Sequence, residues 1–378
     1  MPAYLDHAAT TPMWPEAVDA MVPYFSDRFG NASGSHAVSR EAKKALEESR
    51  DVVAECLGAQ PGEIVFTGGG TEADNLAILG RHEVHRGQVV CSAIEHHAVL
   101  HAAEAVTSAP RLAPVTTGGI VDLDALSELL DAGVTVVSVM LSNNEIGTIE
   151  PLAEVRQLLT ERAPEAVLHT DAVQAFPWLD VASLARPAEL VAVSAHKFGG
   201  PKGVGALVVR DGVKVSPIVH GGGQERGRRS GTYNVAGIVG MAAAMRATVA
   251  RRAETVARVS VLRDRLVDGL VEAVPDSAET GDRSAKVAGN CHVSFGGVES
   301  ESLLMLLDAA GIYAAAGSAC QSGAMEPSHV VTAVGLSAER ALGSLRLSLG
   351  VTTTDDDVDL ALSVIPPAVA RLREPVTR

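Results

Sequence analysis

Six apolar stretches of strand length, separated by turn signals and helical patterns, constrain the fold of this 378-residue chain more than any other feature. Most of them are apolar throughout, which is typical of strands covered by helices on both faces. Strands that alternate with helices favour a mostly parallel sheet. The sequence therefore predicts an α/β fold whose large domain is built on such a sheet. The six stretches are Glu63–Thr67, Gln88–Ser92, Val134–Leu141, Ala166–Asp171, Leu190–Ala195 and Gly203–Arg210.

A change of pattern towards the C-terminus predicts a second, smaller domain. The segment 234–273 has the pattern of one long helix rich in Ala, Arg and Leu, and we place the domain boundary within it, near residue 258. The segments that follow form an α+β pattern. The expected strands are Asn290–Phe295 and Gly343–Leu349, and the expected helices are Glu301–Ala310 and Asp355–Leu372. Pro366 and Pro367 are expected to break or kink the last helix. The large domain should comprise residues 14–257, and the small domain residues 1–13 and 258–378.

The charge and composition exclude several classes of partner. A formal net charge of −15 opposes general attraction to nucleic acid or anionic lipid, so we expect small molecules and proteins as partners. No stretch approaches the roughly 18 consecutive apolar residues that cross a bilayer, and the first residues do not resemble a signal peptide. A cytoplasmic protein is therefore expected. Widely spaced cysteines and the absence of C-x-x-C and H-E-x-x-H motifs predict no metal site.

Lys197 is the residue with the most informative chemistry, because it follows a predicted buried strand and lies in the turn Ser194-Ala-His-Lys-Phe-Gly-Gly. Its amine would emerge at the carboxyl end of that strand, where open α/β sheets bind ligands. Partial burial there favours the neutral, nucleophilic form of the amine. This arrangement suits a Schiff base with pyridoxal 5'-phosphate (PLP). For a lysine considered alone, a solvated loop position is the more common interpretation.

A glycine-rich turn, Phe66-Thr-Gly-Gly-Gly-Thr-Glu-Ala-Asp-Asn, follows the first predicted strand and opens a helix. Its glycines permit close approach, and the N–H groups of the first helical turn favour a phosphate. A tight turn capped by Thr71 is an equally good interpretation of this stretch alone. The stretch lacks both G-K-[ST] and G-x-G-x-x-G, which disfavours a P-loop or a dinucleotide site.

Further polar residues follow the other predicted strands. Asp171, three residues before Gln174, could hold a pyridinium nitrogen protonated, although a helix N-cap is favoured for it in isolation. His96 could stack on a cofactor ring and carry protons near neutral pH, but a lone histidine is more often structural. Asn144 adds an amide at the same sheet edge. The basic, glycine-rich loop His220–Thr232 could reach a phosphate. Its His-Gly-Gly-Gly element has no accompanying G-x-S-x-G, so a serine hydrolase is disfavoured.

Together these motifs resemble those of the cysteine desulfurase family, whose members are fold type I PLP enzymes related to class-V aminotransferases. The resemblance spans nearly the whole chain, and the motifs occur in the family order. One departure is Gly70, which stands where alanine is usual. The motifs are Tyr4-Leu-Asp-His-Ala-Ala-Thr-Thr-Pro12, Thr-Glu-Ala-Asp-Asn, Glu-His, Asn-Asn-Glu-Ile-Gly, Asp-Ala-Val-Gln, Ser-Ala-His-Lys, Gly317-Ser-Ala-Cys320 and Arg346-Leu-Ser-Leu-Gly350.

The resemblance implies how the cofactor would be held. Lys197 would bind PLP covalently, Asp171 would pair with its pyridine nitrogen, and His96 would stack on its ring. Gln174 would approach the phenolic oxygen. The phosphate would be held by Gly70, Thr71, Ser194 and His196, with Thr232 reaching across from the second subunit of a homodimer.

The resemblance also implies a substrate site and a reaction. Asn144 and Arg346, assisted by Asn31, would bind the carboxylate of L-cysteine. Cys320 lies among small residues, which indicates a mobile, exposed loop. Its thiolate, formed with help from His96, would attack the substrate sulfur, leaving a persulfide on Cys320 and releasing L-alanine. The sulfur would pass to an acceptor protein in iron–sulfur cluster assembly, tRNA or DNA thiolation, or thio-cofactor synthesis.

Two other classes of function are open at this point. A selenocysteine lyase or a class-V aminotransferase would use the same cofactor, and would accept selenocysteine or a keto acid after Cys320 is removed. A sulfur-relay scaffold with weak catalysis is a further alternative. The presence of Lys197, Asp171 and His96 argues against a catalytically inactive scaffold.

Overall fold

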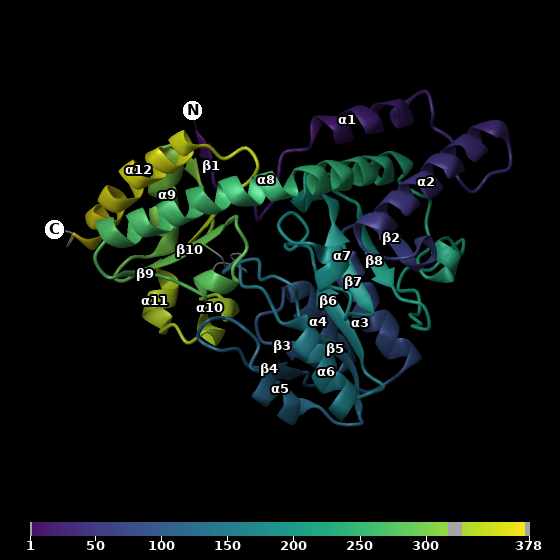
Figure 1. Cartoon of the computed structure of the whole chain (residues 1–378), viewed down its shortest axis with the longest axis horizontal. Coiled ribbons are helices and arrows are strands. Elements are labelled where there is room, and N and C mark those ends of the chain that lie inside the picture. The colour runs from purple at the N-terminus through teal and green to yellow at the C-terminus, as the bar shows by residue number, and fades with distance from the viewer. Residues whose placement is uncertain (1, 317–326, 375–378) are drawn as a thin grey trace.

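The computed structural model describes residues 2–316 and 327–374. Its centre is a seven-stranded sheet in the order β2-β8-β7-β6-β5-β3-β4 (Figure 1). The pairings from β4 through β3, β5 and β6 to β7 are parallel, whereas β8 runs antiparallel to both of its neighbours. The prediction of a mostly parallel α/β sheet is thus confirmed. The strands are β2 (Ile64–Thr67), β3 (Gln88–Ser92), β4 (Arg111–Ala113), β5 (Val134–Ser138), β6 (Val167–Asp171), β7 (Leu190–Ser194) and β8 (Gly205–Val209).

Helices cover both faces of this sheet, and successive residues of one strand enter different cores. In β3, Val89 and Cys91 pack under α3 (Gly70–Val84) and α4 (His97–Val106), whereas Val90 packs on the opposite face. This alternation explains why the strands are apolar throughout. The helices of the opposite face are α2 (Ala37–Cys56), α5 (Leu123–Leu129), α6 (Leu152–Arg162), α7 (Val181–Leu184) and the first half of α8 (Val235–Ala273).

The long helix α8 joins the two parts of the molecule (Figure 1). Its 39 residues span roughly 60 Å at the usual rise per residue. Asn234 caps its start by accepting a hydrogen bond from Gly237 N at 3.0 Å. Residues up to Met245 pack in the core of the large sheet, and residues from Val259 onward pack in a second core. Helix α1 (Pro15–Met21) and the short η1 (Val22–Phe25) lie against its first half.

The second core lies in the C-terminal part but also contains Ala3 and Leu5 from the other end of the chain. A three-stranded antiparallel sheet in the order β12-β10-β9 is covered by α9, α12 and the second half of α8. β1 (Ala3–Tyr4) pairs with β11 (Ile312–Tyr313). The remaining elements are β9 (Ser277–Glu279), β10 (Asn290–Phe295), α9 (Ser300–Ala309), α10 (His329–Ala333), α11 (Ala338–Leu342), β12 (Ser344–Ser348) and α12 (Asp355–Arg373). The exact domain boundary stays a prediction.

Pro366 and Pro367 were expected to break or kink the last helix, and the expected break is wrong. Helix α12 continues through both prolines to Arg373. The prolines remove two backbone donors, but Ile365 and Val369, which flank them, are fully buried and hold both halves of the helix on the core. The free energy gained by packing this apolar face therefore outweighs the free energy lost with the two backbone hydrogen bonds that the prolines cannot form.

Candidate active site

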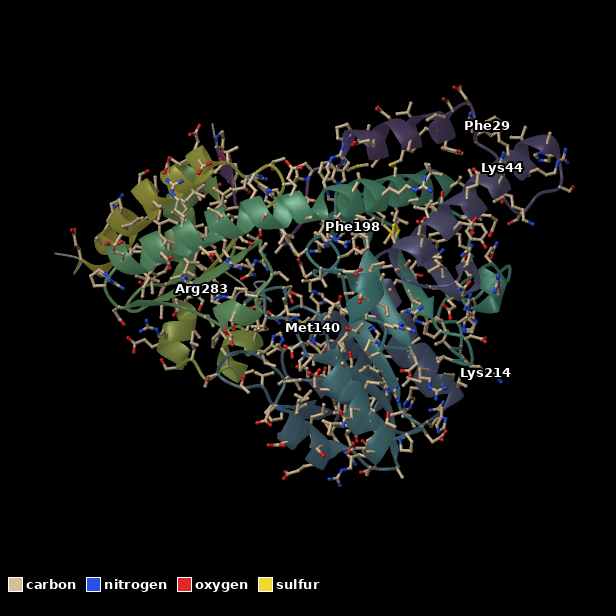
Figure 2. All side chains as sticks on the ribbon, in the orientation of Figure 1. Phe29, Lys44, Met140, Phe198, Lys214 and Arg283 are labelled. Carbon is tan, nitrogen blue, oxygen red and sulfur yellow. The ribbon has the colours of Figure 1, made fainter. Side chains whose placement is uncertain are left out.

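The carboxyl ends of four neighbouring parallel strands bring the predicted polar residues to one edge of the large sheet. β6 ends at Asp171, and β7 ends at Ser194 and leads directly into the short helix η3 (Ala195–Lys197). The residues after β3 and β5 lead to His96 and Asn144 at the same edge. Phe198, which follows Lys197, lies near the middle of the molecule, below α8 (Figure 2).

The Lys197 amine is held by the N-terminal segment. Its Nζ donates to the carbonyl oxygens of Ala8 at 2.6 Å and Ala9 at 2.9 Å. Desolvation and, after it, the charge of Arg346 lower the pKa of Lys197 from 10.5 to about 8, while Asp171 and Asp6 act in the opposite direction. The lysine is therefore far more nucleophilic at neutral pH than an ordinary surface lysine.

Asp171 lies in a buried acidic environment. It is 6% exposed, and its Oδ1 accepts a hydrogen bond from Val173 N at 2.8 Å. Burial, together with the neighbouring carboxyl of Asp74, raises the pKa of Asp171 to about 7, and the charge of Lys197 opposes that rise. A cation placed against Asp171 would favour its ionised form, as the nitrogen of a pyridinium ring would.

A buried pair lies behind Asp171 and was not predicted from the sequence. His169 Nε2 lies 3.5 Å from Asp74 Oδ1, and His169 Nδ1 shares a hydrogen bond with Ser138 Oγ at 2.9 Å. Burial raises the pKa of Asp74 to about 8 and lowers that of His169 to about 4, so both side chains are mainly neutral at pH 7. The strand period of two places His169 on the same face as Asp171, which is the signal that could have indicated it.

His96 caps the start of α4, because its Nδ1 accepts from Ala98 N at 3.1 Å. Its side chain keeps solvent-exposed surface, yet surrounding protein atoms desolvate the ring. This desolvation and the positive charge of Lys197 lower the pKa of His96 to about 4. A neutral imidazole at this position can accept a proton or stack on an aromatic ring.

The glycine-rich turn forms the N-terminus of α3 as predicted. Gly69 has a φ of +150°, a conformation that side chains rarely adopt. A Cβ at Gly70 would lie 2.8 Å from Val173 Cγ2 and 3.3 Å from Ser194 Cβ, so a side chain at this position would have to displace these neighbours. Thr71 is exposed in the first turn, and Ser194 is 2% exposed. His196 Nδ1 shares a hydrogen bond with Thr10 Oγ1 at 3.3 Å.

Arg346 comes to this edge from the other part of the molecule. Its Nη1 donates to Asn144 O at 3.2 Å, and its Nη2 donates to Asp6 Oδ1 at 2.9 Å. Gln174 Nε2 donates to Ala8 O at 2.7 Å, the carbonyl that Lys197 also uses. The sequence motif beginning at Tyr4 contained Asp6 and Ala8, but no chemistry was assigned to them.

Two of the predicted residues, Asn31 and Thr232, are not brought to this site. Asn31 is exposed, and its side-chain oxygen accepts from Ser33 N at 2.9 Å. Figure 2 shows Phe29, two residues before it, at the far end of the molecule from Phe198. Thr232 is also exposed. Within the described residues, neither Thr232 nor Asn31 forms a hydrogen bond or ion pair with Lys197, Asp171 or Arg346. Cys320 lies outside the described residues.

Two general features of the described ranges 2–316 and 327–374 bear on function. No group of three or more His, Cys, Asp or Glu side chains there has the arrangement needed to hold a metal ion. None of the helices in these ranges combines the length and the apolar character needed to cross a membrane.

Comparison with known proteins shows the family of this chain. The family model of aminotransferase class-V matches residues 3–361. The chain is 47% identical to an IscS-like cysteine desulfurase of Mycobacterium tuberculosis, with 98% of this chain and 97% of the relative covered. It is 44% identical to the cysteine desulfurase IscS of Methanosarcina thermophila, with 98% and 92% covered. A solved structure of a NifS-like protein superposes with a TM-score of 0.91 at 34% identity, covering 98% of this chain and all of the other. The chain therefore belongs to the aminotransferase class-V family and, within it, to the cysteine desulfurases.

Proposed function

We propose that this cysteine desulfurase uses PLP bound at Lys197 to remove sulfur from L-cysteine, leaving L-alanine and a persulfide on Cys320. The observation that carries the proposal is the position of Lys197 between the ends of β6 and β7. There its amine is largely desolvated, with a pKa lowered to about 8, and lies in the field of Asp171. These are the two groups that a pyridoxal ring requires, a neutral amine for its aldehyde and a carboxyl for its nitrogen.

The surrounding residues fit a phosphorylated ring. The N-terminus of α3, with the glycines at 69 and 70, offers backbone N–H groups and close access to an anion. Ser194 and His196 lie on the adjacent turn and, with Gly70 and Thr71, would hold the phosphate. His96 would stack on the ring, and Gln174 would approach the phenolic oxygen. When bound, PLP supplies an electron sink for negative charge at the substrate Cα.

The chain's own groups would perform the remaining tasks. Arg346 and Asn144 would bind the substrate carboxylate. To do so, the Arg346 guanidinium must either bind the carboxylate alongside Asp6 or give up its hydrogen bond to Asp6. Lys197, once released, would take the Cα proton of the substrate. The Cys320 thiolate would attack the substrate sulfur, so that a sulfur–sulfur bond forms and the carbon–sulfur bond breaks. The substrate Cβ keeps the electron pair and takes a proton, and the proton held by Lys197 returns to Cα, which gives alanine.

The test is to incubate the purified protein with L-cysteine and to measure alanine and protein-bound persulfide. Lys197→Ala should abolish both products together with the visible absorbance of the cofactor. Cys320→Ala should keep the absorbance and lose the persulfide. If the wild type forms no alanine, or if Cys320→Ala transfers sulfur undiminished, the proposal is rejected.

We also propose a homodimer in which Thr232 of one subunit reaches the phosphate in the partner's site. Asn31 would assist in binding the substrate carboxylate. Both residues are exposed in the single chain, and Phe25 and Phe29 near Asn31 are 68% and 72% exposed, as expected for an interface. Mixing inactive Lys197→Ala with Thr232→Val subunits under exchange conditions should restore activity, because a mixed dimer contains one intact site. Absence of restoration despite proven exchange would argue against a shared site.

The partner that accepts the sulfur is proposed to be a protein of iron–sulfur cluster assembly, or one of tRNA, DNA or thio-cofactor thiolation. The support is chemical, because a persulfide is a reactive carrier that must be passed to another nucleophile. Trapping the Cys320 persulfide with isotopically labelled sulfur and identifying the labelled acceptor would decide between these pathways.

A further inference from the structure

A cavity adjoins the candidate active site at Lys197. It shares Lys197, Asn144 and Gln174 with the candidate active site, but His96, Asp171 and Arg346 do not line it. Its walls come from the N-terminal segment, the middle of α8, the 287–290 turn and the residues that follow β12. It therefore lies where both parts of the molecule meet.

Both tryptophans of the sequence line this cavity. Trp14 Nε1 donates to Phe198 O at 3.1 Å and to Thr248 Oγ1 at 3.0 Å, and its ring is packed so closely that a Cβ at Gly199 would lie 2.4 Å from it. The ring of Trp178 packs against Gly289, where a Cβ would lie 2.1 Å away. The two indoles are thus fixed apolar walls, as is usual in small-molecule sites.

The polar lining has an electrostatic bias. Lys197 and Arg252 line the cavity, whereas no Asp or Glu does, in a chain with a net charge of −15. Arg252 Nη2 donates to Phe176 O at 3.1 Å, but its buried Nε–H has no hydrogen-bond partner in the described residues. A buried donor without a partner is costly, so this guanidinium favours an anionic acceptor.

Two further lining residues are buried, and one polar atom of each lacks a hydrogen-bond partner in the described residues. His7 and Asn290 are each 4% exposed, and neither His7 Nδ1 nor Asn290 Oδ1 has a hydrogen-bond partner in the described residues. Buried polar groups in folded proteins are almost always satisfied. Their presence in the same cavity as the Arg252 Nε–H indicates a ligand that offers several polar atoms.

We propose that this cavity binds a small organic carboxylate with a flat apolar body, whose carboxylate accepts from Arg252 and whose body lies against Trp14 and Trp178. The ligand would contact the N-terminal segment whose carbonyls hold Lys197, so that its binding is coupled to the reactive amine. This inference concerns binding and stands whether or not the proposed reaction is correct.

The experiment is a titration of the purified, cofactor-bearing full chain with sodium benzoate, followed by tryptophan fluorescence at constant ionic strength. Benzoate should give a saturable change, and neutral benzamide should bind at least tenfold more weakly. Arg252→Gln should weaken benzoate binding at least tenfold. Arg246→Gln, on the same helix but outside this cavity, should bind as the wild type does.

Two further variants test whether benzoate binds in this cavity. Thr255→Met adds bulk to the cavity wall and should block binding even if the arginine variant folds poorly, as judged by circular dichroism. Arg346→Gln tests whether benzoate instead occupies the proposed substrate site. The proposal is overturned if no saturable change occurs, if folded Arg252→Gln binds as tightly as the wild type, or if only Arg346→Gln abolishes binding.

Discussion

The lowered pKa of Lys197 makes a quantitative prediction about its reaction with aldehydes. A decrease from 10.5 to about 8 leaves roughly one amine in ten neutral at pH 7, against roughly one in three thousand for an ordinary lysine. The folded protein should therefore hold about 300-fold more reactive amine at pH 7 than an exposed lysine does. Desolvation is the main cause, and the Arg346 charge adds to it.

The assay is the rate of PLP capture by the cofactor-free protein between pH 6 and 11, followed by absorbance. The rate attributable to Lys197, obtained by subtracting Lys197→Met, should rise with pH and level off near pH 8. The ε-amine of Nα-acetyllysine is the control and should level off near its ordinary pKa of about 10.4. Arg346→Gln should move the protein midpoint upward and Asp171→Asn downward, because these charges act on the amine in opposite directions. A rate that keeps rising to pH 10 in parallel with the control refutes the reasoning.

The same shift has a consequence for the stability of the cofactor-free protein. Between pH 8 and 10.5 the unfolded chain keeps a proton on Lys197 that the folded chain has lost. Stability rises with pH wherever the unfolded state binds more protons. Relative to Lys197→Met, the wild type should therefore gain up to about 3 kcal/mol of unfolding free energy across this window, measured by urea unfolding. A difference in unfolding free energy between the two proteins that does not change with pH would contradict the assigned pKa of Lys197.

Three other substitutions test separate parts of the structure. Glu225→Gln leaves the buried guanidinium of Arg50 without its 2.7 Å partner and should cost about 3–5 kcal/mol in urea unfolding, whereas the double change Arg50→Met with Glu225→Leu should cost less. Gly70→Ala should weaken PLP binding to the cofactor-free protein at least tenfold, and Val173→Ala should restore part of it, because that valine occupies the space of the new methyl group. Asp6→Asn removes the negative charge that pairs with the candidate carboxylate-binding guanidinium, so KM for L-cysteine should fall by up to about fivefold, as expected for a partly exposed ion pair. An increase in KM would show that Asp6 positions that guanidinium instead.

Most of the fold could be predicted from the sequence, because its elements depend on local patterns. The six predicted strands coincide with β2, β3 and β5 to β8 to within three residues at each end, and the long helix was placed correctly. The sequence gives a weaker signal for β4, which has three residues and begins with the partly exposed Arg111. The continuity of α12 through two prolines could not be predicted, since it depends on tertiary packing.

The candidate site was predictable where a motif ends a strand, and not where pairing depends on distant segments. Asp171 ends β6, and Lys197 and His96 follow β7 and β3. These strands belong to one run of four neighbouring parallel strands, β7-β6-β5-β3, so the shared edge follows from the topology. Asp74 lies on a helix, and its partner His169 lies on a strand about 95 positions further along the chain. No local sequence pattern predicts that these two side chains meet. Asp6 and Arg346 are even further apart in sequence.

The N-terminal segment explains why the two parts of the chain make one site. Leu5 packs in the second core, while three and four residues on, at Ala8 and Ala9, the backbone carbonyls bind the amine that follows β7 of the large sheet. Between them, Asp6 binds the guanidinium of Arg346 on β12. Five residues, the last three of them in a hydrogen-bonded turn, thus connect the proposed nucleophile, the proposed carboxylate-binding arginine and the second core. Any displacement of that core relative to the sheet must therefore alter the hydrogen bonds of Lys197, because a segment this short has little slack to absorb the movement.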